Sequence, residues 1–196
     1  MQIFRTALLA GFIAISSAAH AQQNINIRGT LTAVNGKDLS IKARDGRELQ
    51  IELPDGVNVS ITKTFSMADV KPGMVLGVTT VKRVDGAVVA IDVRPIPATA
   101  NQGLTPYDLQ PDSTMTNASV EATVQAAGGQ ELTLNYKTGT VKVLVLPNTP
   151  MSLAAPGNRT DLIPGEAINV AARPDKDGKL LAVRVQVGKD GLKPTW

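Results

Sequence analysis

The second half of the chain repeats the first, and this internal repeat constrains the fold more than any other feature. The phrase Leu39-Ser40-Ile41 recurs 93 positions later as Leu132-Thr133-Leu134. The phrase Asp69-Val70-Lys71-Pro72-Gly73 recurs 92 positions later as Asp161-Leu162-Ile163-Pro164-Gly165. Turn residues and apolar positions repeat, whereas candidate catalytic side chains do not. The repeat therefore predicts two copies of one structural unit within 196 residues, and it leaves the chemistry of the protein open.

The N-terminus has the composition of a secretory signal peptide. Arg5 supplies a positive charge, residues 7–15 form a short apolar run, and Ala19-His20-Ala21 matches a cleavage site. The apolar run is too short for a transmembrane anchor, and polar residues follow it. We therefore expect residues 1–21 to be a signal peptide that is cleaved after Ala21, which would place the mature protein in the bacterial periplasm or outside the cell.

The mature chain would contain neither histidine nor cysteine. The full sequence has no cysteine, and its single histidine, His20, lies inside the signal peptide. Nucleophilic sites that depend on histidine or cysteine, and imidazole or thiolate metal sites, are thereby excluded. The segment 175–178 (Asp-Lys-Asp-Gly) could offer oxygen ligands, but it lacks the length and closing glutamate of a calcium loop and is typical of a hairpin turn. We expect no catalytic residue, no cofactor and no metal site.

Alternating apolar residues in the first repeat predict five short strands. Three strands are separated by the turns Asn35-Gly36 and Asp45-Gly46, and their apolar positions include Leu31, Ile41 and Ile51. Ser66 can cap a single helical turn, with Asp69 in the capping-box position. Residues 74–81 and 87–94 then form a hairpin. The order of three strands, a short helix and a hairpin is typical of an OB-type barrel, and an open meander or sandwich is the alternative.

The second repeat has the same order of elements. The sequence thus predicts an all-β fold of two tandem, small five-stranded OB-like barrels, each with one short helix between strands three and four. Residues 22–97 would form repeat one and residues 119–196 repeat two. Residues 98–118 contain two prolines and no apolar period, so we expect a linker. This linker is too long for a simple turn, and Tyr107 and Leu109 are its expected anchors.

The third strand differs between the repeats and suggests an interface. Aligning Leu53-Pro54 with Leu146-Pro147 places three valines opposite the polar outer face of repeat one, namely Val141, Val143 and Val145 opposite Glu48, Gln50 and Glu52. A strand that is apolar on both faces is expected to be covered on both. We therefore predict that these valines are covered by repeat one, by the Tyr107–Leu109 part of the linker, or by another protein. The alternative is a register change that buries them in their own barrel.

A recurring order of short motifs connects both repeats to a known family. The order is a strand that begins at glycine, an L-x-I strand, a D-x-x-P-G helix end, a D-G turn and an A-x-x-V strand, here at Gly29 and at residues 39–41, 69–73, 85–86 and 90–93. This pattern resembles exported bacterial proteins with one or two OB-like domains of unknown function. The linker phrase Asp108-Leu109-Gln110-Pro111 is also similar to theirs. Some members are labelled "metal ABC transporter permease", but a permease needs several apolar spans of about 20 residues and none follows residue 21.

The composition disfavours nucleic acid as a partner. OB-type folds bind single strands by stacking bases on aromatic side chains over a basic groove. After signal cleavage only Phe65, Tyr107, Tyr136 and Trp196 are aromatic, and 19 Lys and Arg residues face 17 Asp and Glu residues. We therefore expect a non-catalytic exported protein that binds or scaffolds an envelope protein or a small ligand. The alternatives are a soluble accessory protein of a metal or solute uptake system and a hydrolase that uses paired carboxylates.

Overall fold

The computed structural model describes residues 24–194, which are mostly β-strand. The first repeat supplies β1 (Ile25–Asn35), β2 (Asp38–Ala43), β3 (Glu48–Glu52), β4 (Val59–Thr64), β5 (Val75–Lys82) and β6 (Val88–Pro95). The remaining strands are β7 (Gly103–Pro106), β8 (Thr114–Ala126), β9 (Gly129–Tyr136), β10 (Gly139–Val145), β11 (Ser152–Pro156), β12 (Ala167–Pro174) and β13 (Leu180–Val187). The expected signal peptide and its cleavage site after Ala21 lie outside the described residues.

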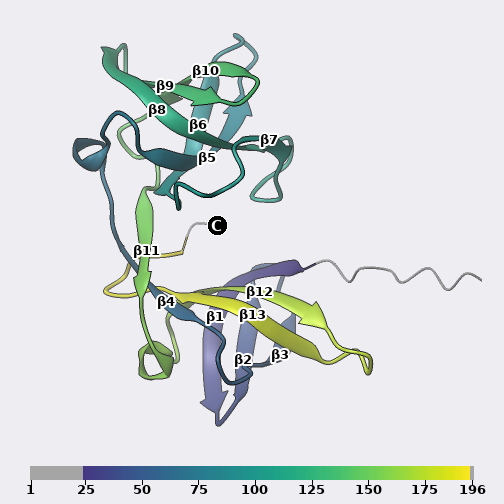
Figure 1. Cartoon of the computed structure of the whole chain (residues 1–196). Helices are drawn as coiled ribbons and strands as arrows, with labels where there is room; N and C mark the ends of the chain where they lie inside the picture. Colours follow the sequence, from purple (N-terminus) through teal and green to yellow (C-terminus); the bar gives the residue numbers. More distant parts are fainter. Residues whose placement is uncertain (1–23, 195–196) are drawn as a thin grey trace, which may run out of the picture.

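The strands form two closed five-stranded barrels, which confirms the expected all-β class (Figure 1). The first barrel consists of β1, β2, β3, β13 and β12, and it closes where Leu180 pairs with Ile51 in parallel. The second barrel consists of β8, β9, β10, β6 and β5, and it closes where Leu144 pairs with Val89 in parallel. In each barrel the closing contact joins the third strand to the fifth, as in an OB-type barrel.

The two repeats exchange their last two strands. The first barrel takes β1–β3 from repeat one and β12 and β13 from repeat two, while the second barrel takes β8–β10 from repeat two and β5 and β6 from repeat one. The expectation that each repeat forms its own barrel is therefore wrong, and the repeat boundaries do not separate the barrels. Repeat one also has six strands and not the expected five, because β4 is a separate strand that leads out of the first barrel.

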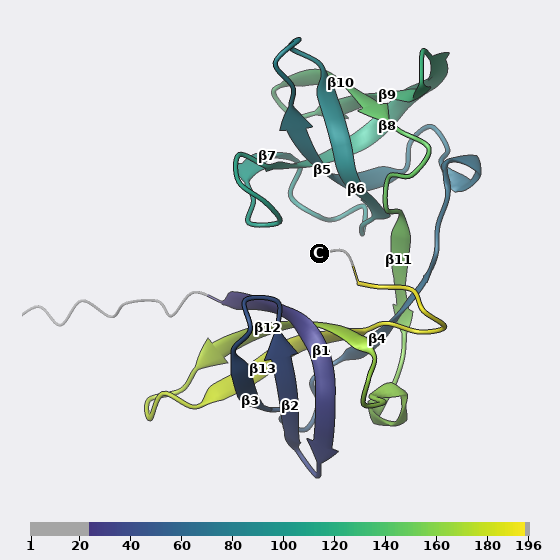
Figure 2. The same cartoon turned by 180° about the vertical axis from the view of Figure 1, so that it is seen from behind.

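The strands β4 and β11 connect the barrels as an antiparallel pair. Ser152 pairs with Thr64 and Pro156 pairs with Ser60, so the pairing is centred on Thr62 and Ala154, which occupy equivalent positions of the two repeats 92 residues apart. A half-turn about this centre exchanges the two strands of the pair. In both views β11 runs between the two barrels (Figures 1 and 2). Each repeat thus passes from one barrel into the other along this two-stranded ribbon.

Each barrel core combines side chains from both repeats. In the first barrel Ile41 and Ile51 of repeat one pack with Val170 and Val185 of repeat two, and all four are fully buried. The second core pairs residues such as Leu76 with Leu132 in the same way. Burying each such side chain contributes roughly 1.5–3 kcal/mol. Neither repeat can therefore bury its apolar strands in this arrangement without the other.

The expected short helices are single 3-10 turns. The first, η1 (Met67–Asp69), has the predicted capping box, in which the Asp69 carboxylate accepts from the Ser66 backbone N–H at 2.9 Å. The second, η2 (Arg159–Asp161), is capped in the same way by Asn158. The predicted short helices are therefore not confirmed: each segment is a 3-10 turn of three residues that ends before Pro72-Gly73 or Pro164-Gly165.

Candidate functional site

The three valines of β10 lie inside the second barrel, which corrects the predicted interface. Val143 and Val145 are 0% and 2% exposed, and the half-buried Val141 packs against the same core. The strand pairings explain the error. Ile41 pairs with Leu49 in the first barrel, whereas Leu134 pairs with Val141 in the second, so the turn before β10 is one residue shorter than its counterpart. A one-residue change reverses both faces of a strand.

By strand pairing, the three valines of β10 are equivalent to Leu49, Ile51 and Leu53, which point into the first barrel. They are not equivalent to the polar residues on the outer face of β3. Strands β5 and β6 of repeat one do cover them, but as part of the same barrel. The alternative reading, a register change that buries the valines in a barrel core, is the one that the pairings support. The outer face of β10 carries Lys142 and the half-buried Leu144.

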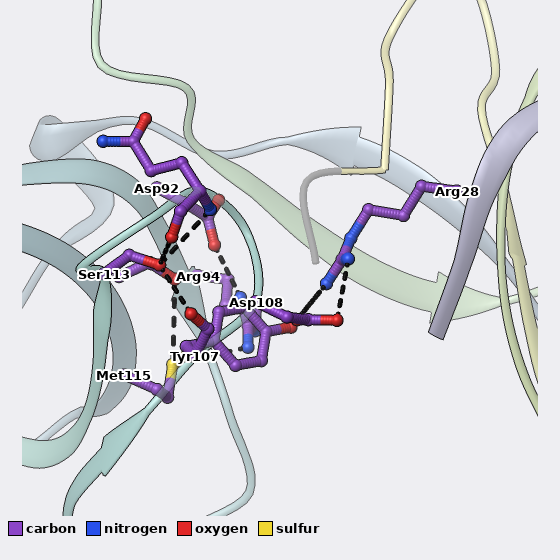
Figure 3. A network of polar contacts seen from close by, with 9 residues as sticks. Arg28, Asp92, Arg94, Tyr107, Asp108, Ser113 and Met115 are labelled. Carbon is purple, nitrogen blue, oxygen red and sulfur yellow. Dashed lines mark hydrogen bonds and ion pairs between the residues drawn. The ribbon is translucent and has the colours of Figure 1, made fainter. Parts of the chain in front are cut away.

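The expected linker contains a strand and a contact between the barrels. Strand β7 pairs with β8 at the edge of the second barrel, and Tyr107 and Asp108 follow it. Arg28, on β1 of the first barrel, donates to Asp108 at 2.8 Å and to the Tyr107 hydroxyl at 3.3 Å, and its guanidinium lies 5.6 Å from the Tyr107 ring centre (Figure 3). We call these three residues the polar bridge. Leu109, the other expected anchor, is half-buried beside Arg28 and Arg44.

The polar bridge is held by the loop that carries it. The Ser113 hydroxyl hydrogen-bonds the carbonyl oxygens of Tyr107 and Gln110 at 2.8 Å each, which fixes the turn around Asp108. The hydrogen bond from Arg28 is the main reason that the pKa of Asp108 lies below its usual value. An ionised Asp108 therefore faces Arg28 at neutral pH, and the loop can keep the two barrels at a defined distance.

A buried ion pair lies behind this loop in the second barrel. Asp92 is fully buried on β6, and the guanidinium of Arg94 donates to it at 2.5 Å (Figure 3). A second nitrogen of Arg94 contacts the sulfur of Met115 at 3.5 Å. A buried carboxylate is strongly unfavourable without a partner, so the Arg94 guanidinium is expected to stay on Asp92. This ion pair therefore holds Arg94 in one orientation.

Arg94 lines a cleft between the barrels. The cleft has a volume of about 790 Å³ and is lined from the second barrel by residues that include Arg94, Tyr107 and Asn117 and from the first barrel by Asn26 and Arg184. Burial lowers the pKa of Arg184, and the positive charges of Arg94 and Arg28 act in the same direction. The guanidinium groups of Arg94 and Arg184 thus line this cleft from opposite barrels, and the rest of its lining is largely apolar. Guanidinium groups bind carboxylates and phosphates with two parallel hydrogen bonds.

Sequence reasoning did not select these arginines. Asp92 and Arg184 occupy equivalent positions of β6 and β13, 92 residues apart, and each stands on a strand whose other face is buried in a core. In the sequence, a charged residue between apolar strand residues is the feature that could have marked these two positions. What brings Arg28, Arg94 and Arg184 together is the contact between barrels, which local patterns do not report.

The remaining predicted positions have structural roles. Asp175 accepts hydrogen bonds from the backbone N–H groups of Asp177 and Lys179 at 2.9 and 2.8 Å, which confirms the hairpin turn between β12 and β13. Over residues 24–194 no group of three or more His, Cys, Asp or Glu side chains could hold a metal ion. In the same part of the chain, no helix has the length and apolar character of a membrane span.

Comparison with known proteins gave no relative. No family model matches the chain, and neither the curated proteins nor the solved structures include a significant match.

Proposed function

We propose that this protein is a non-catalytic binding protein that is exported to the bacterial periplasm or envelope, and that its ligand occupies the cleft between the barrels. The observation that carries the proposal is the gathering of Arg94 and Arg184 with Tyr107 in this cleft. Arg94 is held by its buried ion pair with Asp92, so one wall of the cleft is preorganised. The sequence features of residues 1–21 support the export step.

The charges around the cleft favour a small anion. Two arginines, Arg94 and Arg184, line the cleft, and no carboxylate is among its lining residues. The charge of Arg94 is balanced by the buried Asp92. The side chains of Asn26, Asn117 and Tyr107 add neutral hydrogen-bonding groups. A volume of about 790 Å³ is suited to a metabolite-sized ligand. The proposed ligand is therefore a small molecule that carries a carboxylate or a phosphate group.

The test is a ligand screen on the mature protein. Thermal denaturation is measured with a panel of di- and tricarboxylates and phosphorylated small molecules, and each stabilising compound is then titrated by calorimetry. A ligand at 100 times its Kd stabilises the folded state by about 2.7 kcal/mol. Arg184→Gln is expected to weaken binding at least tenfold. The matched control is Arg173→Gln, because Arg173 is exposed on the adjacent strand β12. Equal affinities for the two variants would refute the assignment of the cleft.

A further inference from the structure

The second barrel has a groove at one end that is separate from the inter-barrel cleft. The groove has a volume of about 630 Å³, and its apolar lining includes Phe65, Met67, Leu146, Pro147 and Met151. Gln130 and Gln125 are its longest polar side chains, and no ionisable residue lines it. A concave apolar surface with few polar groups is the usual form of a small-molecule site.

The first barrel shows what occupies the equivalent place there. Arg159 of η2 donates hydrogen bonds to the carbonyl oxygens of Leu53 and Pro54, both at 2.8 Å, and lies 3.4 Å from Asp55. The side chain of this arginine thus reaches the end of the first barrel and satisfies two backbone acceptors. The internal repeat supplies a direct comparison of the two barrel ends.

The second barrel lacks this internal occupant. Met67 stands 92 residues before Arg159, and a thioether cannot donate a hydrogen bond. The carbonyl of Leu146, the counterpart of Pro54, accepts from the backbone N–H of Thr149 at 3.0 Å. In the part of the chain that the structure describes, the Oε1 atom of Gln130 is buried and has no hydrogen-bond partner. A buried acceptor without a partner is unfavourable. Gln130 lines the groove, so a rotation of its side chain would bring this oxygen to a donor on a ligand.

The groove also lacks the charge that accompanies Arg159. Pro147 stands at the position of Asp55, so no carboxylate is present to balance a cationic ligand. Burying an unpaired charge in an apolar site is unfavourable. We propose that this groove is a second binding site, and that it takes an uncharged aromatic or apolar small molecule with one N–H or O–H donor, which hydrogen-bonds to Gln130 Oε1.

Two probes of the same shape test the proposal on the full mature protein. Indole carries an N–H donor on an apolar body, and benzothiophene has sulfur in place of that N–H. Each is titrated against isotope-labelled protein by NMR. We expect saturable shifts at residues 129–130 and 145–147, and an affinity for benzothiophene about tenfold lower than that for indole, which corresponds to the loss of one hydrogen bond. Equal affinities, or no saturable shifts at these residues, would overturn the proposal.

Variants identify the atoms involved. Met67→Arg reproduces the residue found in the first barrel and is expected to fill the groove and abolish indole binding, whereas Met67→Leu keeps the groove open and retains binding. Gln130→Leu is expected to lower the affinity for indole to that for benzothiophene. Where a variant loses the dispersed spectrum of the folded protein, the comparison of the two probes on the unaltered protein still decides the outcome. Arg184→Gln changes the other cleft and is expected to leave indole binding unchanged, so the two proposals fail separately.

Discussion

The exchange of strands between the repeats can be tested with an engineered disulfide. Glu52 of repeat one is paired with Leu181 of repeat two where the first barrel closes, so we choose the double variant Glu52→Cys/Leu181→Cys. The protein has no native cysteine to compete. Paired residues of adjacent strands lie within the Cα separation that a disulfide requires.

The expected stabilisation follows from the length of the closed loop. The bond would enclose about 130 residues, for which the chain-entropy estimate is about 5 kcal/mol. Engineered disulfides often reach less than this value because of strain. The ion pair between Glu52 and Lys179 is absent from the oxidised and the reduced variant alike, so its loss does not enter the comparison. We therefore expect a net gain of about 2–4 kcal/mol in the oxidised protein, measured by urea denaturation against the reduced protein.

The matched control uses the strand that would close the first barrel without exchange. Val89 of repeat one occupies the position in β6 that Leu181 occupies in β13, and it pairs with Leu144 in the second barrel. Glu52→Cys/Val89→Cys should therefore form no intramolecular disulfide, as measured by free-thiol titration and electrophoresis without reductant. A rapid, stabilising bond in this control, together with free thiols in the Glu52→Cys/Leu181→Cys variant, would refute the exchanged topology.

Three further predictions concern the core, the polar bridge and export. Val143→Glu places a charge in the second core and is expected to destabilise the protein by more than about 3 kcal/mol. Lys142→Gln, which removes only an exposed ion pair with Glu131 on the outer face, is expected to change little, and circular-dichroism melts that coincide would contradict the buried position of Val143. Because the folded-state pKa of Asp108 is lowered, the Arg28–Asp108 pair stabilises the fold above pH 3.8, and this contribution is lost as the pH falls through the folded-state pKa. Asp108→Asn should then lower stability at pH 7 by less than about 1 kcal/mol, since the carboxylate is half exposed, and the difference should vanish in strong acid. Intact-mass measurement of exported protein should give a chain that begins at Gln22, and a mass that retains residues 1–21 would contradict the proposed cleavage.

The contacts between the barrels could not be seen in either repeat alone. Arg28 and Asp108 are 80 residues apart in the chain, and Arg94 and Arg184 stand on the last strands of different repeats. Their approach depends on how the barrels are joined, so no local pattern could place these residues near one another. The open groove of the second barrel is different, because the replacement of Arg159 by Met67 at equivalent positions was present in the sequence. The effect of this difference on the barrel end became clear only from the hydrogen bonds that Arg159 makes in the structure.

The sequence by itself determined the all-β class, the order of the ten barrel strands and the turns between their hairpins, whereas β4, β7 and β11 were not predicted. These features are local: alternation of apolar residues specifies a half-buried strand, and glycines such as Gly46 and Gly86 adopt the positive φ that their turns require. Only the tertiary structure decided which repeat completes each barrel and which face of β10 is inside. Because both repeats have the same apolar pattern, the sequence does not tell which of them completes the barrel that β1–β3 begin; in the structure β4 and β11 carry each repeat from one barrel into the other. The face of β10 depends on a single residue in the preceding turn, because side chains alternate along a strand and one position reverses them all.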